Sequence, residues 1–228
     1  MESTDEILRR VTDEYRKAVV LPESKPRVPY LLCPVGLVGA GKSTVIIPLA
    51  RRLSLVRIST DEIRHLIGDL GEAWDRVPEV AYSLIREFVM SGYAVAIDSD
   101  CVSIFETVND ETEKYGLPVF WIHIDPPEDF IIRKLSSFRH TWLFRDATEA
   151  LETYRERKRF HEKLSMPFIF RFDPSRDDLP DQIETCALMI ERKMKIEFLI
   201  LWKLSRIRRH CSRSVMKAVG RFRKSALQ

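Results

Sequence analysis

The sequence predicts an α/β fold in which a parallel sheet of five strands lies between two layers of helices. Five short apolar runs alternate with stretches whose apolar residues recur at helical spacing, and this alternation is typical of a parallel sheet with crossover helices. The runs are apolar at successive positions, as expected for strands that are covered on both faces. A chain of 228 residues is long enough for one sizeable domain with additions.

The first 29 residues are expected to form a helix and a linker. Apolar residues from Ile7 to Val19 recur at helical spacing, and three prolines within residues 21–29 end the helix and extend the chain. The expected strands follow within a domain that covers residues 30–190. They are Tyr30–Val35, Leu55–Ser59, Tyr93–Asp98, Pro118–Asp125 and Pro167–Asp173.

Two prolines conflict with this pattern locally. Pro34 falls in the first expected strand, which should be central, and it lacks the N–H that a strand pairs through. We expect it to mark an early exit from the sheet. Pro48 falls in the next expected helix, where a proline typically costs about 3 kcal/mol, and we expect a kink there.

The last segment, residues 191–228, is expected to form a basic amphipathic helix. Between Arg192 and Gln228 there are twelve Lys and Arg and a single Glu, so this segment carries +11, and residues 1–191 carry −8 because the whole chain carries +3. Such asymmetry is typical of contact with nucleic acid or an anionic membrane surface. The apolar stripe suits packing on the chain's own domain or an oligomer contact equally well.

Composition excludes several classes of protein. With 45% hydrophobic and 31% charged residues and only 8 Gly and 12 Pro, the chain is neither collagen-like nor wholly disordered. No secretion signal and no apolar run of membrane-spanning length is visible. The four cysteines contain no CxxC pair, so neither a zinc site nor a disulfide framework is expected. We therefore expect a cytoplasmic protein.

A glycine-rich segment follows the first expected strand. Gly36–Ser43 reads GLVGAGKS and satisfies G-x-x-x-x-G-K-[ST]; we call it the phosphate loop. Its glycines let backbone N–H groups turn inward around phosphate oxygens. Lys42 supplies a cation for the β and γ phosphates, and the Ser43 hydroxyl is a ligand for bridging Mg²⁺. ATP is therefore expected to contact Gly36, Gly39, Ala40, Gly41, Lys42, Ser43 and Thr44.

Carboxylates and an arginine follow the next two expected strands. STDEIR places Asp61 at the carboxyl end of the second strand and Arg64 one helical turn later, facing the crevice in which ligands bind to open α/β sheets. Asp61 can accept the proton of an attacking hydroxyl, and Arg64 can hold an acceptor or developing charge. Asp98 ends the third run in the hhhhD form of a carboxylate that holds Mg²⁺ through water.

The order of these motifs resembles the P-loop kinases of the polynucleotide 5′-hydroxyl kinase and zeta-toxin type. The resemblance covers about residues 30–190 and continues through YAVAIDSD and FDPSRDDLPDQIE. It implies a three-layer P-loop NTPase sandwich, with the strand before the phosphate loop at its centre and the D-x-x-R strand to one side. It also implies that Asp61 is a general base and that Arg64 contacts the acceptor. Asp100 departs from the family, which more often has a small or amide residue there, and its role stays open.

The resemblance also implies a lid at about residues 133–147. Lids of this family place one or two arginines over the transferring phosphate, where a bidentate cation stabilises charge on its oxygens. Arg133 and Arg139 fit this role best, and Arg145 fits it less well.

These features predict an ATP-dependent kinase that transfers the γ-phosphoryl group to a hydroxyl, with a nucleic-acid 5′-hydroxyl favoured by the basic tail. A zeta-toxin-like or small-molecule kinase is one alternative. Another is a nucleotide-dependent switch whose tail binds RNA, a membrane or a partner protein.

Overall fold

The computed structural model describes residues 4–71, 74–137, 143–161 and 165–196. The chain divides into two compact units, Met1–Leu188 and Met189–Gln228. A helix over residues 179–196 ends the described part. The expected basic tail lies outside the described residues from position 197 onward.

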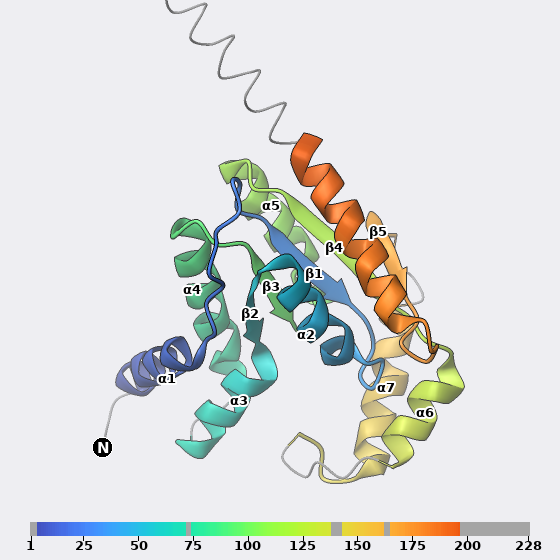
Figure 1. Ribbon diagram of the computed structural model, residues 1–228. Coiled ribbons are helices and arrows are strands. Elements are labelled where there is room, and N and C mark those ends of the chain that lie inside the picture. The colour runs from blue at the N-terminus through green and yellow to red at the C-terminus, as the bar shows by residue number, and fades with distance from the viewer. Residues whose placement is uncertain (1–3, 72–73, 138–142, 162–164, 197–228) are drawn as a thin grey trace, which may run out of the picture. The chain divides into compact units, whose positions relative to one another are not determined.

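Five strands form one parallel sheet in the first unit (Figure 1). They are β1 (Leu31–Val35), β2 (Val56–Ser59), β3 (Val95–Asp98), β4 (Val119–Ile124) and β5 (Phe168–Phe172). Their order is β2-β3-β1-β4-β5, and every neighbouring pair is parallel. The predicted α/β fold is thus confirmed, with β1 at the centre and β2 at one edge.

Helices cover both faces of this sheet. The α-helices before residue 179 are α1 (Thr4–Ala18), α2 (Lys42–Leu53), α3 (Thr60–Asp69), α4 (Val77–Met90), α5 (Phe105–Tyr115), α6 (Glu128–Ser136) and α7 (Ala147–His161). Figure 1 shows α2 on one face and α4 and α5 on the other. All five residues of β1 are buried, which explains its continuous apolar run.

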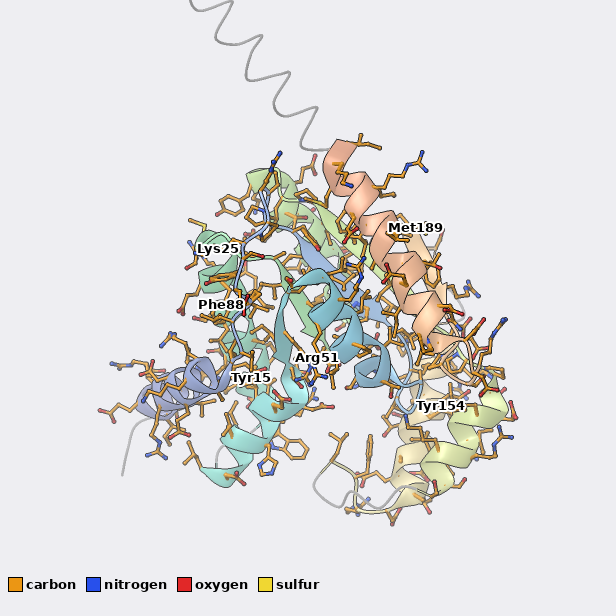
Figure 2. All side chains as sticks on the ribbon, in the orientation of Figure 1. Tyr15, Lys25, Arg51, Phe88, Tyr154 and Met189 are labelled. Carbon is orange, nitrogen blue, oxygen red and sulfur yellow. The ribbon has the colours of Figure 1, made fainter. Side chains whose placement is uncertain are left out.

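The N-terminal helix α1 packs against α3 and α4. Its apolar stripe supplies Ile7, Leu8, Val11 and Tyr15 to a core that also contains side chains of β2, α3 and α4. Tyr15 and Phe88 are labelled in Figure 2 at this junction. The segment predicted as a separate helix and linker therefore belongs, in its helical part, to the same compact unit as the sheet.

The two prolines are accommodated in different ways. Pro34 stays in β1 opposite Ile122 of β4, whereas the pairing of β1 with β3 ends at Leu32. The Pro34 carbonyl accepts a hydrogen bond from the Cys101 amide at 3.0 Å. The early exit that we predicted is thus limited to the β3 side. Helix α2 continues through Pro48 to Leu53.

Among the helices that the structure describes, none is both long enough and apolar enough to cross a membrane.

Candidate active site

The phosphate loop connects the end of β1 to the start of α2. Gly39 and Gly41 have φ angles of +80° and +92°, which residues with a Cβ rarely adopt. A Cβ on Gly39 would also lie 2.9 Å from the Leu135 side chain. The loop therefore needs glycine at both positions for its backbone conformation, and at Gly39 also for its contact with α6.

Lys42 begins α2 and turns back over the loop. Its Nζ donates hydrogen bonds to the carbonyls of Gly36 at 2.9 Å and Leu37 at 3.0 Å. Burial lowers the pKa of Lys42, while the carboxylates of Asp100, Asp61 and Asp98 act in the opposite direction. Carboxylates from two places, the end of β3 and the first turn of α3, thus act on the charge of one ammonium group.

Ser43 and Asp98 lie side by side. The Ser43 hydroxyl donates to Oδ1 of Asp98 at 3.0 Å, and only 3% of the Asp98 side chain is exposed. Magnesium prefers oxygen ligands and is usually held by one or two carboxylates together with substrate phosphates. This hydroxyl–carboxylate pair fits that requirement. No group of three or more His, Cys, Asp or Glu suited to a metal occurs in the described part of the chain.

The other oxygen of Asp98 is bound by Arg57, a residue that the sequence analysis did not single out. Arg57 Nε and Nη2 each lie 2.8 Å from Asp98 Oδ2. Its Nη1 donates to Glu62 Oε1 at 2.7 Å. Arg57 is a cation between the apolar residues Val56 and Ile58 of an edge strand, and this position is the sequence signal that could have identified it.

Asp61 and Arg64 lie in α3 and form an ion pair with each other. Helix α3 begins after Ser59, whose Oγ accepts from the Glu62 amide at 3.4 Å. Asp61 lies in the first turn of α3, two residues after Ser59, which ends β2 and pairs with Asp98 at the end of β3. The structure therefore brings Lys42, Ser43, Asp61 and Asp98 to the carboxyl edge of the sheet.

Asp100 has well-defined partners. It is 6% exposed, accepts from the Gly36 amide at 3.3 Å and accepts from Nε2 of His161 at 3.0 Å. Burial by itself raises the pKa of Asp100, but the His161 hydrogen bond and the charge of Lys42 outweigh this effect and lower it. Asp100 therefore joins the first residue of the phosphate loop to α7.

Helix α7 also supplies an arginine that the sequence analysis missed. Arg157 Nη1 lies 4.0 Å from Asp100 Oδ2, and the charge of Arg157 lowers the pKa of Lys42. Arg157 and His161 are four residues apart and therefore lie on one face of the helix. That spacing is visible in the sequence, but nothing in the sequence shows what the face contacts.

Two of the arginines expected in the lid pair with neighbouring acidic residues. Arg133 is 71% exposed and pairs with Asp129 one turn earlier in α6, at 2.6 Å. The exposed Arg145 bonds to Glu149 near the start of α7. Arg139 lies outside the described residues. Arg133 thus contacts Asp129 and Arg145 contacts Glu149, and neither contact places an arginine beside Lys42 or Asp98.

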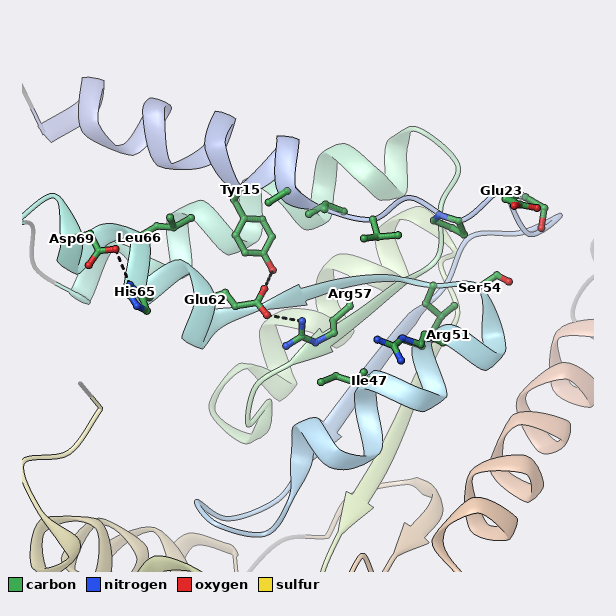
Figure 3. A pocket seen from close by; sticks show the side chains of 17 residues that line it. Tyr15, Glu23, Ile47, Arg51, Ser54, Arg57, Glu62, His65, Leu66 and Asp69 are labelled. Atoms are coloured by element: carbon green, nitrogen blue, oxygen red, sulfur yellow. Dashed lines mark hydrogen bonds and ion pairs between the residues drawn. The ribbon is translucent and has the colours of Figure 1, made fainter. Parts of the chain in front are cut away.

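Two cavities flank this site. One, of about 380 Å³, lies between β4, α6 and α7 and includes His123 and His161 in its wall. Among the described residues, Nδ1 of both histidines is buried without a hydrogen-bond partner. The other, of about 990 Å³, lies beside β2 and is lined by α1, α2, α3 and the linker after α1 (Figure 3).

Comparison with known proteins shows a fold but no family. No protein-family model matches the sequence, and no curated protein matches it. A proposed kinase of Chloroflexus aurantiacus is similar in structure at a TM-score of 0.56 and 17% identity, over 72% of this chain and 99% of that one. The PezAT toxin–antitoxin system of Streptococcus pneumoniae gives a TM-score of 0.54 at 15% identity, over 87% and 98%.

APS kinase CysC of Mycobacterium tuberculosis, solved in complex with AMPPNP and APS, is also similar. Its TM-score is 0.50 at 19% identity, and the match covers 73% of this chain and 99% of that chain. Together these likenesses show that the chain has the fold of the P-loop kinases.

Proposed function

We propose that this protein is an ATP-dependent kinase that transfers the γ-phosphoryl group to a hydroxyl of an acceptor. The observation that carries the proposal is the convergence of Lys42, Ser43, Asp61 and Asp98 at the carboxyl edge of the sheet, beside the phosphate loop. Phosphoryl transfer requires little covalent chemistry from the protein and depends on positioning and charge stabilisation. These four side chains supply both.

The donor half of the site consists of the phosphate loop and Asp98. Lys42 donates to two loop carbonyls and would exchange them for the β and γ phosphate oxygens of ATP. Ser43 and Asp98 would hold Mg²⁺, which when bound neutralises charge on these phosphates.

The acceptor half consists of Asp61 and Arg64. Asp61 would leave its ion pair with Arg64 and take the proton of the acceptor hydroxyl. The hydroxyl oxygen then forms a bond to the γ phosphorus, the bond from that phosphorus to the bridging oxygen breaks, and ADP departs. Arg64, released from Asp61, would hold an anionic group of the acceptor.

Arg157 is the described arginine best placed to stabilise the transferring group. Its Nη1 lies 4.0 Å from Asp100 Oδ2, and its charge lowers the pKa of Lys42. A γ-phosphate beside Lys42 would compete with Asp100 for this guanidinium, and charge on the phosphate oxygens is what a bidentate cation stabilises.

For the acceptor we favour a nucleic-acid 5′-hydroxyl, supported by the +11 charge of residues 192–228. A nucleotide sugar is the second candidate.

Transfer of label from γ-labelled ATP tests the proposal. The acceptors are a 5′-hydroxyl oligonucleotide, a nucleotide sugar and APS, with labelled product separated after each reaction. We expect labelled acceptor with the wild-type protein. Binding of ATP without transfer to any hydroxyl would instead favour a nucleotide-dependent switch.

Replacing Asp61 identifies the base. Asp61→Asn should lower transfer by about 10²-fold or more, because the hydroxyl loses its proton acceptor, and calorimetry should show nearly unchanged ATP affinity. Asp69→Asn, at the exposed end of the same helix, is the matched control and should transfer label normally. Equal rates for the two variants would remove Asp61 from the mechanism.

A further inference from the structure

We propose that Arg57 is a positioning residue. It keeps the donor half of the candidate site, which contains Asp98, and the acceptor half, which contains Asp61, in a fixed arrangement relative to each other. The inference rests on the proposed function and assigns a role to a residue that none of the sequence motifs contains. Arg57 lies in the edge strand β2 between the buried Val56 and Ile58, with 25% of its side chain exposed.

The guanidinium of Arg57 connects two carboxylates from different elements. Nε and Nη2 bind Asp98 at the end of β3, and Nη1 binds Glu62 in the first turn of α3. Glu62 directly follows Asp61, the expected base. One planar cation thus spans from the expected metal ligand to the helix turn that carries the base, which the point charge of a lysine cannot reproduce.

The second oxygen of Glu62 is bound as well. Tyr15 donates its hydroxyl to Glu62 Oε2 at 3.2 Å and accepts the Ser59 amide at 2.7 Å. Burial raises the pKa of Tyr15 above its ordinary value, so this hydroxyl keeps its proton. Figure 3 shows Tyr15, Glu62 and Arg57 in this sequence of contacts. The described network runs from Tyr15 in α1 to Ser43 in the phosphate loop.

Arg57 fixes which oxygen of Asp98 faces the metal position. With Oδ2 held by Arg57, Oδ1 is directed at the Ser43 hydroxyl. Without Arg57 the buried Asp98 carboxylate would lack its compensating cation, which is costly in a buried environment, and its oxygens would no longer be held in this orientation. Groups that orient metal ligands typically change metal affinity or activity about 10–100-fold when they are removed.

Arg51 provides a matched control. Arg51 and Arg57 line the same cavity beside β2, and both are labelled in Figure 3. The Arg51 side chain is exposed and forms no ion pair with any residue that the structure describes. Arg51→Met therefore removes a neighbouring guanidinium of the same type without touching Asp98 or Glu62.

The test compares the wild type with Arg57→Lys, Arg57→Met and Arg51→Met. Calorimetry measures the affinity of each protein for ATP, first in EDTA and then at a series of Mg²⁺ concentrations. For both Arg57 variants we expect the Mg²⁺ concentration that half-maximally tightens ATP binding to rise about tenfold. Binding in EDTA should stay near the wild-type value, because Lys42 and the loop remain. Arg51→Met should match the wild type. Arg57→Lys keeps a cation beside Asp98, so this variant can still be measured if Arg57→Met does not fold.

Turnover gives a second, independent measurement. For Arg57→Lys we expect kcat for labelled acceptor to fall about tenfold or more at saturating Mg²⁺, since the helix turn with Asp61 is no longer anchored. Tyr15→Phe should change kcat in the same direction by a smaller factor.

Three results would overturn the inference. An unchanged Mg²⁺ midpoint in Arg57→Lys would show that Arg57 only stabilises the fold, and a lowered midpoint would show that it merely competes with the metal for Asp98. A raised midpoint with an unchanged kcat would remove the link to Asp61. A wild-type protein that binds ATP and Mg²⁺ but phosphorylates no acceptor contradicts the proposed function alone, because the calorimetric test of Arg57 still applies.

Discussion

Asp98 and Asp100 are two residues apart and have entirely different partners. Asp98 bonds to Ser43 and Arg57, whereas Asp100 bonds to the Gly36 amide and His161. Asp98 could be selected from the sequence because it ends an apolar run. The role of Asp100 could not, because its partners lie at the start of the phosphate loop and at the end of α7.

Replacing Gly39 tests whether ATP binding requires the present backbone conformation of the phosphate loop. Gly39→Ala should weaken ATP binding by about tenfold or more, because the φ of +80° is unfavourable for alanine and its Cβ would press on Leu135. Calorimetry measures the affinity, and thermal unfolding measures the effect on stability.

Gly116→Ala is the control for the backbone effect. Gly116 ends α5 with a φ of +60°, and a Cβ there would meet nothing within 4 Å. The Gly116→Ala variant should lower the free energy of unfolding by about 1 kcal/mol and leave ATP affinity unchanged. Equal loss of affinity in both variants would contradict a specific role for Gly39.

The described cysteines should be unreactive in the native protein. Cys33, Cys101 and Cys186 are buried, and burial raises the pKa of Cys186 to about 12. Since the thiolate is the reactive form, only about 10⁻⁴ of Cys186 would be ionised at pH 8. A Cys211→Ser variant should therefore react slowly with an aromatic disulfide reagent. All three thiols should react in guanidinium chloride, and rapid labelling of the folded variant would contradict this burial.

At the scale of elements, α6 and α7 make different contacts near the phosphate loop. Helix α6 packs on the phosphate loop through Leu135 and Ile131, which leaves Arg133 exposed. Helix α7 directs Arg157 and His161 at Asp100. The sequence placed the lid at about residues 133–147 and therefore did not include Arg157, whose contact with Asp100 only the structure shows.

Arg157→Met should lower kcat for phosphoryl transfer by about 10²-fold, because charge on the transferring group loses its stabilising cation. Arg155→Met is the matched control: Arg155 is an exposed arginine two residues earlier in the same helix and should leave kcat near the wild-type value. Steady-state kinetics with labelled ATP compares the two. If Arg133→Met is impaired and Arg157→Met is not, α6 supplies the catalytic arginine instead.

The amphipathic pattern of α1 predicted an apolar face but not the elements against which that face packs. The spacing of Ile7, Leu8 and Val11 predicted a helix with one apolar face, and that face is buried against α3 and α4. The hydrogen bond from the Ser59 amide to Tyr15 could not be predicted, because it spans 44 positions of sequence.

At the scale of the molecule, every described residue of the candidate site lies within the unit Met1–Leu188. A chain that ends at residue 196 should therefore bind ATP with Mg²⁺ as tightly as the full chain. At a nucleotide concentration of 100 times Kd, the free energy of unfolding of both should rise by about 2.7 kcal/mol. Differential scanning fluorimetry with and without nucleotide measures this increase. If only the full chain is stabilised, residues 197–228 contribute to the nucleotide site.

The family resemblance implied the central position of β1, and the sequence by itself determined the α/β fold and the location of the phosphate loop. It did so because continuous apolar runs, helical spacing and a glycine-rich motif are local patterns that physical chemistry permits in few other ways. Only the tertiary structure decided which charged side chains meet. Arg57 reaches Asp98 and Glu62, and His161 reaches Asp100, across separations of 41, 5 and 61 positions. Such pairs arise from the packing of β2, β3, α3 and α7, and no local pattern of residues specifies them.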